Sequence, residues 1–365
     1  KKFIDSLKKL YPNHSIVLST TTPTGYSIAS GSRADLVFYQ PLDFFFIINR
    51  VFKLIDPGCL VLTEAEVWPN LVNKAHKKDV EVSLINARLS NRSAKRFKKY
   101  SFLTSPILKL LRRICIQEES DKKVWEKLGV SSGKIFFTGS IKFDRANIDP
   151  PSEIEEFRNL LKGLFQGKQR SVLLAGSTHP GEELMIARKF KKLKQEFPDL
   201  CYVVAPRHVE RCKNLFEELS KEGLKTQLRS QLDYEQSNQK NSNVIDCLII
   251  DTTGELNAWY HLSDIVIVGK SFLSHGGQNP VEPIFAGKPV IVGPHMENFT
   301  ALVSLLNKHE GIRQIDDSEM LIQSISEILY NTETADNMVI RANEALSCHQ
   351  GASERTAKLI TSKFF

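Results

Sequence analysis

Short runs of apolar and β-branched residues recur along this chain, and polar or helical stretches separate them. In the first half these runs cover residues 15–19, 36–39, 60–63, 80–85, 114–116 and 135–137. In the second half similar runs end near Gly176, Pro206, Asp251 and Val268. Such spacing predicts βα units that build parallel sheets. A length of 365 residues predicts two such domains.

The stretch 264–283 holds the strongest candidate binding site. A buried strand leads into Gly269, and a polar loop with Gly276 and Gly277 precedes an expected helix. Ligands bind at the carboxyl ends of strands in open α/β sheets, and glycines let a ligand approach the backbone closely. The N–H groups of a helix start suit an anion, and Glu282 could bind a pair of sugar hydroxyls. The alternative is a glycine-rich turn with a capping glutamate.

Two other strand ends in the second half carry polar groups. Ser177, Thr178 and His179 stand where a helix is expected to begin, so phosphate could bind there, although His179 could instead cap the helix. Arg207 and His208 follow another predicted strand. An arginine offers five donors in a planar fork, which can hold a phosphate or the edge of a base.

Two acids in the first half, Glu64 and Glu66, stand two residues apart at the end of a predicted strand. Their side chains should therefore point the same way. Pro69 suits the first position of the helix that follows. Acids at a strand end are commonly caps or ion-pair partners, so these residues alone do not indicate catalysis. The threonine-rich segment 20–25 is either a polar rim of the site or an ordinary capped turn.

Aromatic and basic residues in the first half suggest a binding surface. The segment 41–53, with Phe44, Phe45 and Phe46, is either a buried helix or a surface helix that inserts aromatic side chains into a bilayer interface. Basic residues follow, with no acid between Arg88 and Gln117. They include Arg88, Arg92, Arg96, Lys98 and Lys99. Nucleic acid or anionic lipid could bind such a face, and we favour lipid because no nucleic-acid-binding motif accompanies it.

Composition narrows the classes of partner only slightly. The net charge of +7 fits an anionic partner. The six cysteines lack the spacing of a metal site and indicate reduced thiols in a cytosolic compartment. No Asp-x-Asp pair and no histidine cluster at ligand spacing is present, so no metal ion is expected. No apolar run in the sequence reaches about 20 residues, so we expect neither a signal peptide nor a membrane-spanning segment within it.

Several ordered segments resemble the Kdo transferases, which move 3-deoxy-D-manno-octulosonic acid (Kdo) from CMP-Kdo to a lipid A precursor. Three are similar to the donor-site signature of that family: 269–272 (Gly-Lys-Ser-Phe), 276–283 (Gly-Gly-Gln-Asn-Pro-Val-Glu-Pro) and 287–294 (Gly-Lys-Pro-Val-Ile-Val-Gly-Pro). Three more resemble family motifs: 64–70 (Glu-x-Glu-x-Trp-Pro-Asn), 139–144 (Gly-Ser-Ile-Lys-Phe-Asp) and 251–256 (Asp-Thr-Thr-Gly-Glu-Leu). The chain departs from the family pattern at Ser140, Lys270 and Gln278, where many relatives carry asparagine, glycine and histidine.

The resemblance implies the GT-B fold, an α/β architecture of two Rossmann-like βαβ domains facing across a cleft. Residues 1–145 would form the acceptor-binding domain, 146–168 a linker and 169–350 the CMP-Kdo-binding domain. A C-terminal helix at 351–365 would pack back on the first domain. The implied reaction is an inverting transfer of Kdo in lipopolysaccharide inner-core biosynthesis, with no cofactor and no metal ion. The implied location is the cytoplasmic face of the inner membrane, with peripheral attachment or an anchor preceding Lys1.

The resemblance also assigns residues to roles. The donor would lie against Ser177, Thr178, His179, Arg207, His208, Thr253, Gly254, Glu255, Leu256, Gly269, Lys270, Ser271, Phe272, Gly276, Gly277, Asn279 and Glu282. Lys142 would bind a phosphate or the Kdo carboxylate. Glu66, supported by Glu64, would accept hydrogen bonds from sugar hydroxyls. The family's catalytic base is expected upstream of Lys1, so this chain alone is expected to be inactive. The acceptor and the membrane would contact Phe44, Phe45, Phe46, Arg88, Arg92, Arg96, Lys98 and Lys99.

Two other functions remain open on the sequence. One is another GT-B enzyme that uses a UDP-sugar, either a transferase or an epimerase. The other is a membrane-peripheral module that binds a nucleotide without turning it over. Preference for a uridine nucleotide over CMP would indicate the first, and CMP binding without transfer would indicate the second.

Overall fold

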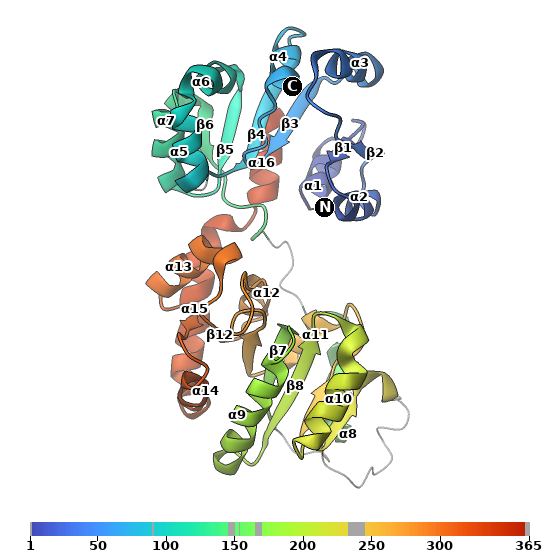
Figure 1. Ribbon diagram of the computed structural model, residues 1–365, viewed down its shortest axis with the longest axis vertical. Helices are drawn as coiled ribbons and strands as arrows, with labels where there is room; N and C mark the ends of the chain where they lie inside the picture. Colours follow the sequence, from blue (N-terminus) through green and yellow to red (C-terminus); the bar gives the residue numbers. More distant parts are fainter. Residues whose placement is uncertain are drawn as a thin grey trace. The chain divides into compact units, whose positions relative to one another are not determined.

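The chain folds into two compact α/β units. The computed structural model describes residues 2–89, 91–144, 150–152, 154–164, 170–232 and 245–361, and only the backbone of residues 91 and 92. The first unit contains Lys1–Ala146 and Cys348–Phe365, and the second contains Asn147–Ser347. In Figure 1 the first unit runs from blue to teal and includes the red C-terminal helix, and the second runs from green to orange.

The first unit is built on parallel strands. Strands β3, β4, β5 and β6 form a four-stranded sheet in that order, and β1 and β2 form a separate pair. The strands are β1 (Val17–Thr20), β2 (Leu36–Tyr39), β3 (Cys59–Thr63), β4 (Glu81–Ala87), β5 (Arg113–Ile116) and β6 (Ile135–Phe137). The helices are α1 (Lys2–Leu10), α2 (Pro23–Ser30), α3 (Phe45–Ile55), α4 (Pro69–His76), α5 (Asn91–Lys99), α6 (Ser101–Leu110), α7 (Lys122–Lys127) and α16 (Ala352–Thr361).

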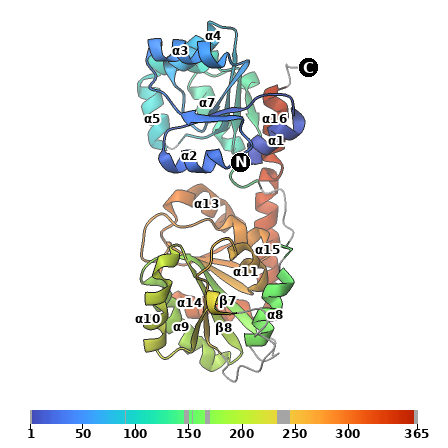
Figure 2. The ribbon, with the colours of Figure 1, turned by 90° about the vertical axis from the view of Figure 1, so that its right-hand side faces the viewer.

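The four-stranded sheet buries side chains on both faces. Because successive side chains of a strand point to opposite faces, Leu84 and Ile85 enter different cores. Leu84 belongs to the larger core, which α3, α4, α6 and α7 supply, with Trp125 fully buried in it. Ile85 packs with Ile360 of α16, and α16 lies against α1 (Figure 2). The last helix of the chain is thus part of the first unit.

Side-chain oxygens cap two helix starts in the first unit, one from a distant residue and one from a neighbouring residue. Helix α4 begins at Pro69, as the sequence predicts, and the Asp43 carboxylate accepts the N–H groups of Asn70 and Leu71 at 2.9 Å each. Such caps satisfy N–H groups that have no partner within the helix. The Thr22 hydroxyl accepts the N–H of Gly25 at the start of α2, so segment 20–25 contains a capped turn.

The second unit has one seven-stranded sheet, all of whose strand pairs are parallel, ordered β13-β12-β11-β7-β8-β10-β9. The strands are β7 (Ser171–Thr178), β8 (Leu200–Pro206), β9 (Thr226–Leu228), β10 (Cys247–Ile249), β11 (Ile265–Val268), β12 (Val290–Val292) and β13 (Arg313–Gln314). The helices are α8 (Ile154–Leu164), α9 (Glu182–Glu196), α10 (Cys212–Lys221), α11 (Leu256–Leu262), α12 (Val281–Phe285), α13 (Thr300–Lys308), α14 (Met320–Tyr330) and α15 (Thr332–Leu346).

The order of these strands defines where a ligand should bind. The chain starts at β7, continues to β8 on one side, and later returns to place β11 on the other side of β7. The point where the strand order reverses therefore lies between the carboxyl ends of β7 and β11. Open α/β sheets bind their ligands at such a point.

The α/β fold with parallel sheets that the sequence predicts is confirmed. The span 146–168, expected to be a linker that includes a polar helix, contains helix α8. Helix α8 buries Phe157, Leu160 and Leu161, and it lies against α11 within the second unit. One face of this helix is thus apolar and buried, whereas the sequence predicts a polar helix within a linker.

Candidate functional site

Two tight turns meet where the strand order of the second unit reverses. Ser177 at the end of β7 and Lys270 after β11 both have left-handed backbones, with φ of 56° and 57°. Non-glycine residues rarely adopt this conformation, and such strain collects at functional sites. The turns touch each other at Gly269, where an added Cβ would lie 2.4 Å from the Cα of Thr178. Only glycine allows this approach.

A buried carboxylate holds the two turns together. Glu182, the first residue of α9, is fully buried. Its Oε2 accepts the N–H groups of His179 and Lys270 at 2.9 and 2.7 Å, and its Oε1 accepts those of Ser271 and Phe272 at 3.0 Å each. Four backbone donors thus converge on one side chain, which fixes the turn after β11 against the start of α9.

This arrangement corrects the expected use of the backbone. The sequence places the helix start beside Ser177, Thr178 and His179, with N–H groups available to phosphate. Helix α9 instead starts at Glu182, whose carboxylate already binds the N–H of His179 and those of the Lys270 turn. Thr178 is buried and donates its hydroxyl to the carboxylate of Glu183 at 3.0 Å. A ligand here must therefore be held mainly by side chains.

Cationic and imidazole groups surround these turns. Lys270 is half-buried and Arg207 is exposed, and neither side chain has a carboxylate partner within the described residues. The rings of His179 and His208 pack edge to face with centroids 5.9 Å apart. Burial lowers the pKa of His179, and the charges of Lys270 and His208 lower it further against the opposing effect of Glu182. His179 is thus neutral near pH 7, and the net charge of the group is positive.

The glycine pair lies beside the same turn. The N–H of Gly277 donates to the carbonyl of Lys270 at 2.9 Å, and an added Cβ on Gly277 would lie 2.4 Å from Sδ of Met296. Oδ1 of Asn279 accepts the N–H of Val281, the first residue of the five-residue helix α12, at 3.1 Å. Glu282 is half-buried in the first turn of α12. The loop from Lys270 to Glu282 thus folds back on itself.

The segment after β10 reaches the carboxyl edge of the same sheet. Thr253 and Gly254 are exposed, and Gly254 has a φ of 91°. The carboxylate of Glu255 pairs with the buried Arg229 at 3.1 Å, and Leu256 begins α11. The side chain of Glu255 therefore stabilises the segment, and Thr253 and Gly254 are the members accessible to a ligand.

The acidic residues of the first unit lie in a turn after β3. Glu64 has a left-handed backbone, with a φ of 59°, so the alternation expected for a strand does not apply to Glu64 and Glu66. Glu64 forms an ion pair with Lys142 at 2.6 Å, and both side chains are exposed. Glu66 is exposed and has no side-chain partner within the described part of the chain. The two acids are therefore in different environments.

Hydrogen bonds to Asn86 and His349 hold the segment that carries Lys142. Asn86 in β4 has a left-handed backbone, with a φ of 51°, and its Oδ1 accepts the N–H of Ile141 at 3.1 Å. The N–H of Ser140 donates to Nδ1 of the buried His349 at 3.1 Å. Burial lowers the pKa of His349 to about 4, so its ring is neutral near pH 7.

Comparison with known proteins decides the family. Residues 1–145 match the family model described as 3-Deoxy-D-manno-octulosonic-acid transferase (kdotransferase). The chain is 31% identical over 361 residues to the 3-deoxy-D-manno-octulosonic acid transferase of Haemophilus influenzae, covering 98% of this chain and 82% of that protein. This chain belongs to the Kdo transferase family. The transferase of Rickettsia felis is 28% identical over 342 residues, which cover 93% of this chain and 70% of that one.

Solved structures agree on the fold of this Kdo transferase. The UDP-GlcNAc 2-epimerase from Neisseria meningitidis bound to UDP-GlcNAc superposes with a TM-score of 0.60 at 15% identity. The match covers 99% of this chain and 95% of the epimerase. At this identity the likeness shows the fold alone, which is the two-domain α/β architecture of the GT-B class.

The aromatic helix of the transferase presents two different faces. Helix α3 buries Ile48 and Phe52, whereas Phe44, Phe45 and Phe46 are 53%, 64% and 70% exposed. The sequence allowed either a buried helix or a surface helix with exposed aromatic side chains, and α3 has one face of each kind. Within the described residues, no helix is both long and apolar enough to cross a bilayer.

The basic segment of the transferase is less uniform than its sequence suggests. Arg96, Lys98 and Lys99 of α5 are exposed, whereas the Arg92 side chain lies outside the described residues. Arg113 is buried and pairs with Glu81 at 2.9 Å. Burial raises the pKa of Glu118 and Asp121, and the charge of the exposed Arg88 partly opposes this rise. The accessible charge therefore centres on α5.

Sequence reasoning missed two kinds of group in this transferase. From the sequence, Glu182 looks like an exposed acid in the first turn of a helix. Only the structure shows that it is buried and accepts four backbone N–H groups. His275, His295 and Glu297 come together from separate loops, and the hydrogen bond from His275 lowers the pKa of Glu297 to about 2.

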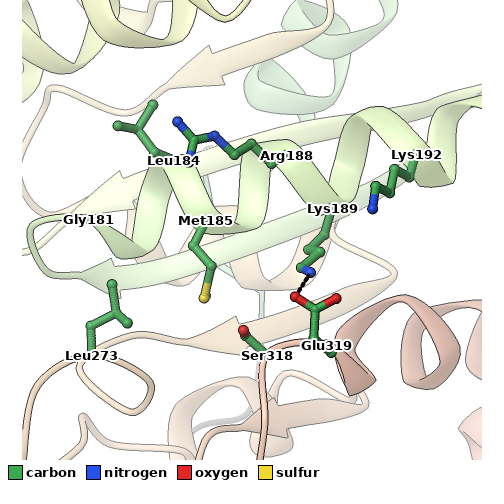
Figure 3. A pocket seen from close by; sticks show the side chains of 9 residues that line it. All are labelled: Gly181, Leu184, Met185, Arg188, Lys189, Lys192, Leu273, Ser318 and Glu319. Atoms are coloured by element: carbon green, nitrogen blue, oxygen red, sulfur yellow. Dashed lines mark hydrogen bonds and ion pairs between the residues drawn. The ribbon is translucent and has the colours of Figure 1, made fainter.

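Sequence reasoning also missed a cavity of about 700 Å³ beside α9. It is lined by Gly181, Leu184, Met185, Arg188, Lys189, Lys192, Leu273, Ser318 and Glu319 (Figure 3). An ion pair joins Lys189 and Glu319 at its edge (Figure 3). None of the residues predicted to bind the donor lines this cavity. The reversal point between β7 and β11, and not this cavity, therefore remains the candidate donor site.

Proposed function

We propose that this transferase moves Kdo from CMP-Kdo to a lipid A precursor with inversion at the anomeric carbon. Membership of the family supports the reaction. The observation that carries the donor assignment is a pair of cations from the strands on either side of β7, Lys270 after β11 and Arg207 after β8, which have no carboxylate partner within the described residues. CMP-Kdo offers a phosphodiester and a carboxylate, so its two anionic groups match two cations.

The donor would rest on side chains around the locked turns. Lys270 and Arg207 hold the phosphate and the Kdo carboxylate. Gly276 and Gly277 are buried against Asn298 and Met296, so they shape the loop beside Lys270 and do not expose backbone to the donor, although the sequence had led us to expect that they would. Glu282 accepts hydrogen bonds from hydroxyls of the ribose. Because Glu182 already occupies the backbone N–H groups, the positive charge that stabilises departing CMP comes from the two cations.

In the transfer step an acceptor hydroxyl oxygen attacks the anomeric carbon of Kdo. The bond from that carbon to the phosphate oxygen breaks, and its electron pair leaves with CMP. The hydroxyl proton passes to a carboxylate. Within the described residues, Glu66 is an exposed acid without a side-chain partner, so we assign it hydrogen bonding to the acceptor. Lys142 would bind an acceptor phosphate or the Kdo carboxylate after exchanging its partner Glu64.

The first unit would also dock on an anionic membrane. The exposed phenylalanines 44–46 provide apolar area for the interface, and the cations of α5 attract anionic headgroups at about 1 kcal/mol each. A lipid A precursor carries acyl chains and phosphates, so the same face suits the acceptor. We therefore propose that the protein acts at the cytoplasmic face of the inner membrane, where a cytosolic nucleotide sugar would meet a membrane-bound acceptor.

The decisive experiment measures Kdo transfer by the full-length protein from CMP-Kdo to a lipid A precursor. Lys270→Ala and Arg207→Ala should each lower kcat/KM about 10-fold to 100-fold, because each removes a hydrogen bond between charged groups. Lys221→Ala, at the end of α10, removes an exposed lysine distant in sequence from these turns and should leave the rate unchanged.

Three outcomes would reject parts of this proposal. Equal rates in the Lys270, Arg207 and Lys221 variants would reject the donor assignment. Inhibition by UDP and not by CMP would point to a UDP-sugar enzyme. Stoichiometric binding of CMP with no transfer by the full-length protein would leave a nucleotide-binding module.

A further inference from the structure

Three potential metal ligands converge beside the glycine pair of the second unit. Nδ1 of His275 lies 2.8 Å from Oε1 of Glu297, and Nδ1 of His295 lies 3.5 Å from the same oxygen. The two imidazole rings pack edge to face with centroids 4.2 Å apart. The three ligand atoms all lie within 4.8 Å of one another. Both rings therefore direct the same nitrogen toward one carboxylate.

The backbone holds these ligands from two loops. The N–H of Gly276 donates to Oε2 of Glu297 at 2.6 Å, and the N–H of Asn298 donates to the carbonyl of Gly276 at 3.1 Å. The N–H of His295 donates to the carbonyl of Ser271 at 3.0 Å. Hydrogen bonds of this kind orient ligands in metal sites and fix which carboxylate oxygen faces the ion. The loop after β11 is thereby tied to the segment after β12.

We propose that His275, His295 and Glu297 form a binding site for a divalent transition-metal ion such as Zn²⁺. Two imidazoles and one carboxylate form a donor set that suits Zn²⁺, Co²⁺ or Ni²⁺, whereas Mg²⁺ and Ca²⁺ prefer oxygen ligands alone. The side chains are 79%, 33% and 53% exposed, so an ion can reach them from solvent. Three protein ligands leave a further position for water or for a group of a bound molecule.

The ion would join the loop that contains the glycine pair to the loop after β12. Its positive charge would lie next to Gly276, within the stretch assigned to the donor. The site does not depend on the identity of the donor, because all three ligands and their supporting bonds come from this chain. Metal binding is therefore measured directly and separately from transfer.

The test uses the full-length protein without a histidine tag, stripped of metal with a chelator. Titration with Co²⁺, followed by its visible absorption, should show one saturable site per chain, and Zn²⁺ should displace the cobalt. His295→Ala and Glu297→Gln should each weaken binding at least tenfold. Glu297→Gln keeps an oxygen for the N–H of Gly276, so it separates loss of the anionic ligand from loss of the fold.

His309→Ala is the matched control, because His309 is an exposed histidine at the end of α13, outside the cluster. It should bind Co²⁺ as the unmodified protein does. Equal binding by all four proteins would show that scattered surface histidines take up the metal and would overturn the proposal, as would the absence of a saturable site. Thermal unfolding of the metal-free variants should match the unmodified protein, which shows that they remain folded.

Discussion

The turns of the two units share a backbone feature but are held very differently. In the second unit Ser177 and Lys270 have left-handed backbones at the ends of neighbouring strands, and in the first unit Glu64 and Asn86 do the same. The turns of the second unit converge on the buried carboxylate of Glu182. The Glu64 side chain instead lies in an exposed ion pair with Lys142.

The turns of the proposed donor side are therefore held more firmly than the acidic turn of the proposed acceptor side, which can rearrange. Breaking a buried charged interaction typically costs about 3–5 kcal/mol, because the remaining polar groups stay in the interior. An exposed ion pair typically contributes about 0–1 kcal/mol. Lys142 can therefore exchange Glu64 for a ligand at little cost, but the turns at Glu182 cannot change partner cheaply.

The largest effect is expected at Glu182. Glu182→Ala leaves four backbone N–H groups without their acceptor, so the free energy of unfolding should fall by at least about 3 kcal/mol and CMP binding should weaken. Urea unfolding and CMP titration measure the two effects. Glu217→Ala, an exposed acid on α10, is the control and should change neither. If Glu182→Ala and Glu217→Ala had the same unfolding free energy and CMP affinity, the turns at Glu182 would be held no more firmly than the exposed turn at Glu64.

Gly269→Ala tests the contact between the two turns of the second unit. The new Cβ would meet the Cα of Thr178 at 2.4 Å, and backbone atoms cannot rotate away, so we expect a loss of about 2–3 kcal/mol in unfolding free energy. Gly133→Ala in the first unit places its Cβ in open space and should be tolerated. A stable Gly269→Ala variant with unchanged CMP binding would show that the turns are not packed as described.

Low pH should lower the free energy of unfolding, because protonation of His349 disrupts its hydrogen bond from Ser140 near Lys142. His349 takes up a proton near pH 6.5 in the unfolded chain but only near pH 4 in the folded one. Between these values the unfolded chain binds more protons, so stability falls as the pH decreases from about 6.5 to 4, by about 2 kcal/mol between pH 7 and pH 5. His349→Gln should lose this part of the pH dependence in urea unfolding. The exposed His309→Gln should retain it, and an unchanged slope in His349→Gln would contradict the assignment.

The smallest effect on stability is expected at the exposed ion pair. Lys142→Met should lower the free energy of unfolding by less than about 1 kcal/mol, since both partners are exposed. Its effect on Kdo transfer should be larger than its effect on stability, because the cation is assigned to a ligand. Melting temperature and kcat/KM measured together separate these effects. A large loss of stability with normal transfer would make the pair structural.

Features that depend on neighbours along the chain could be predicted from the sequence. Apolar runs of strand length, the proline that opens α4 and the glycines that follow β11 are local signals, so they predicted parallel sheets, helix starts and the strand ends that carry the candidate site. Ordered motifs over most of the chain were specific enough to indicate the Kdo transferase family, which comparison confirmed. The roles assigned to individual site residues stay predictions.

Contacts between polar groups that are distant in the sequence could not be predicted and are seen only in the folded chain. Glu182 binds N–H groups 88 to 90 residues away, Arg113 pairs with Glu81 across two strands, and His275 meets His295 and Glu297 from another loop. The order of strands likewise placed the reversal point between β7 and β11. Propensity and periodicity report on residues a few positions apart, whereas these contacts depend on how distant segments pack. Burial then gives them their strength, because a charge removed from water needs a partner.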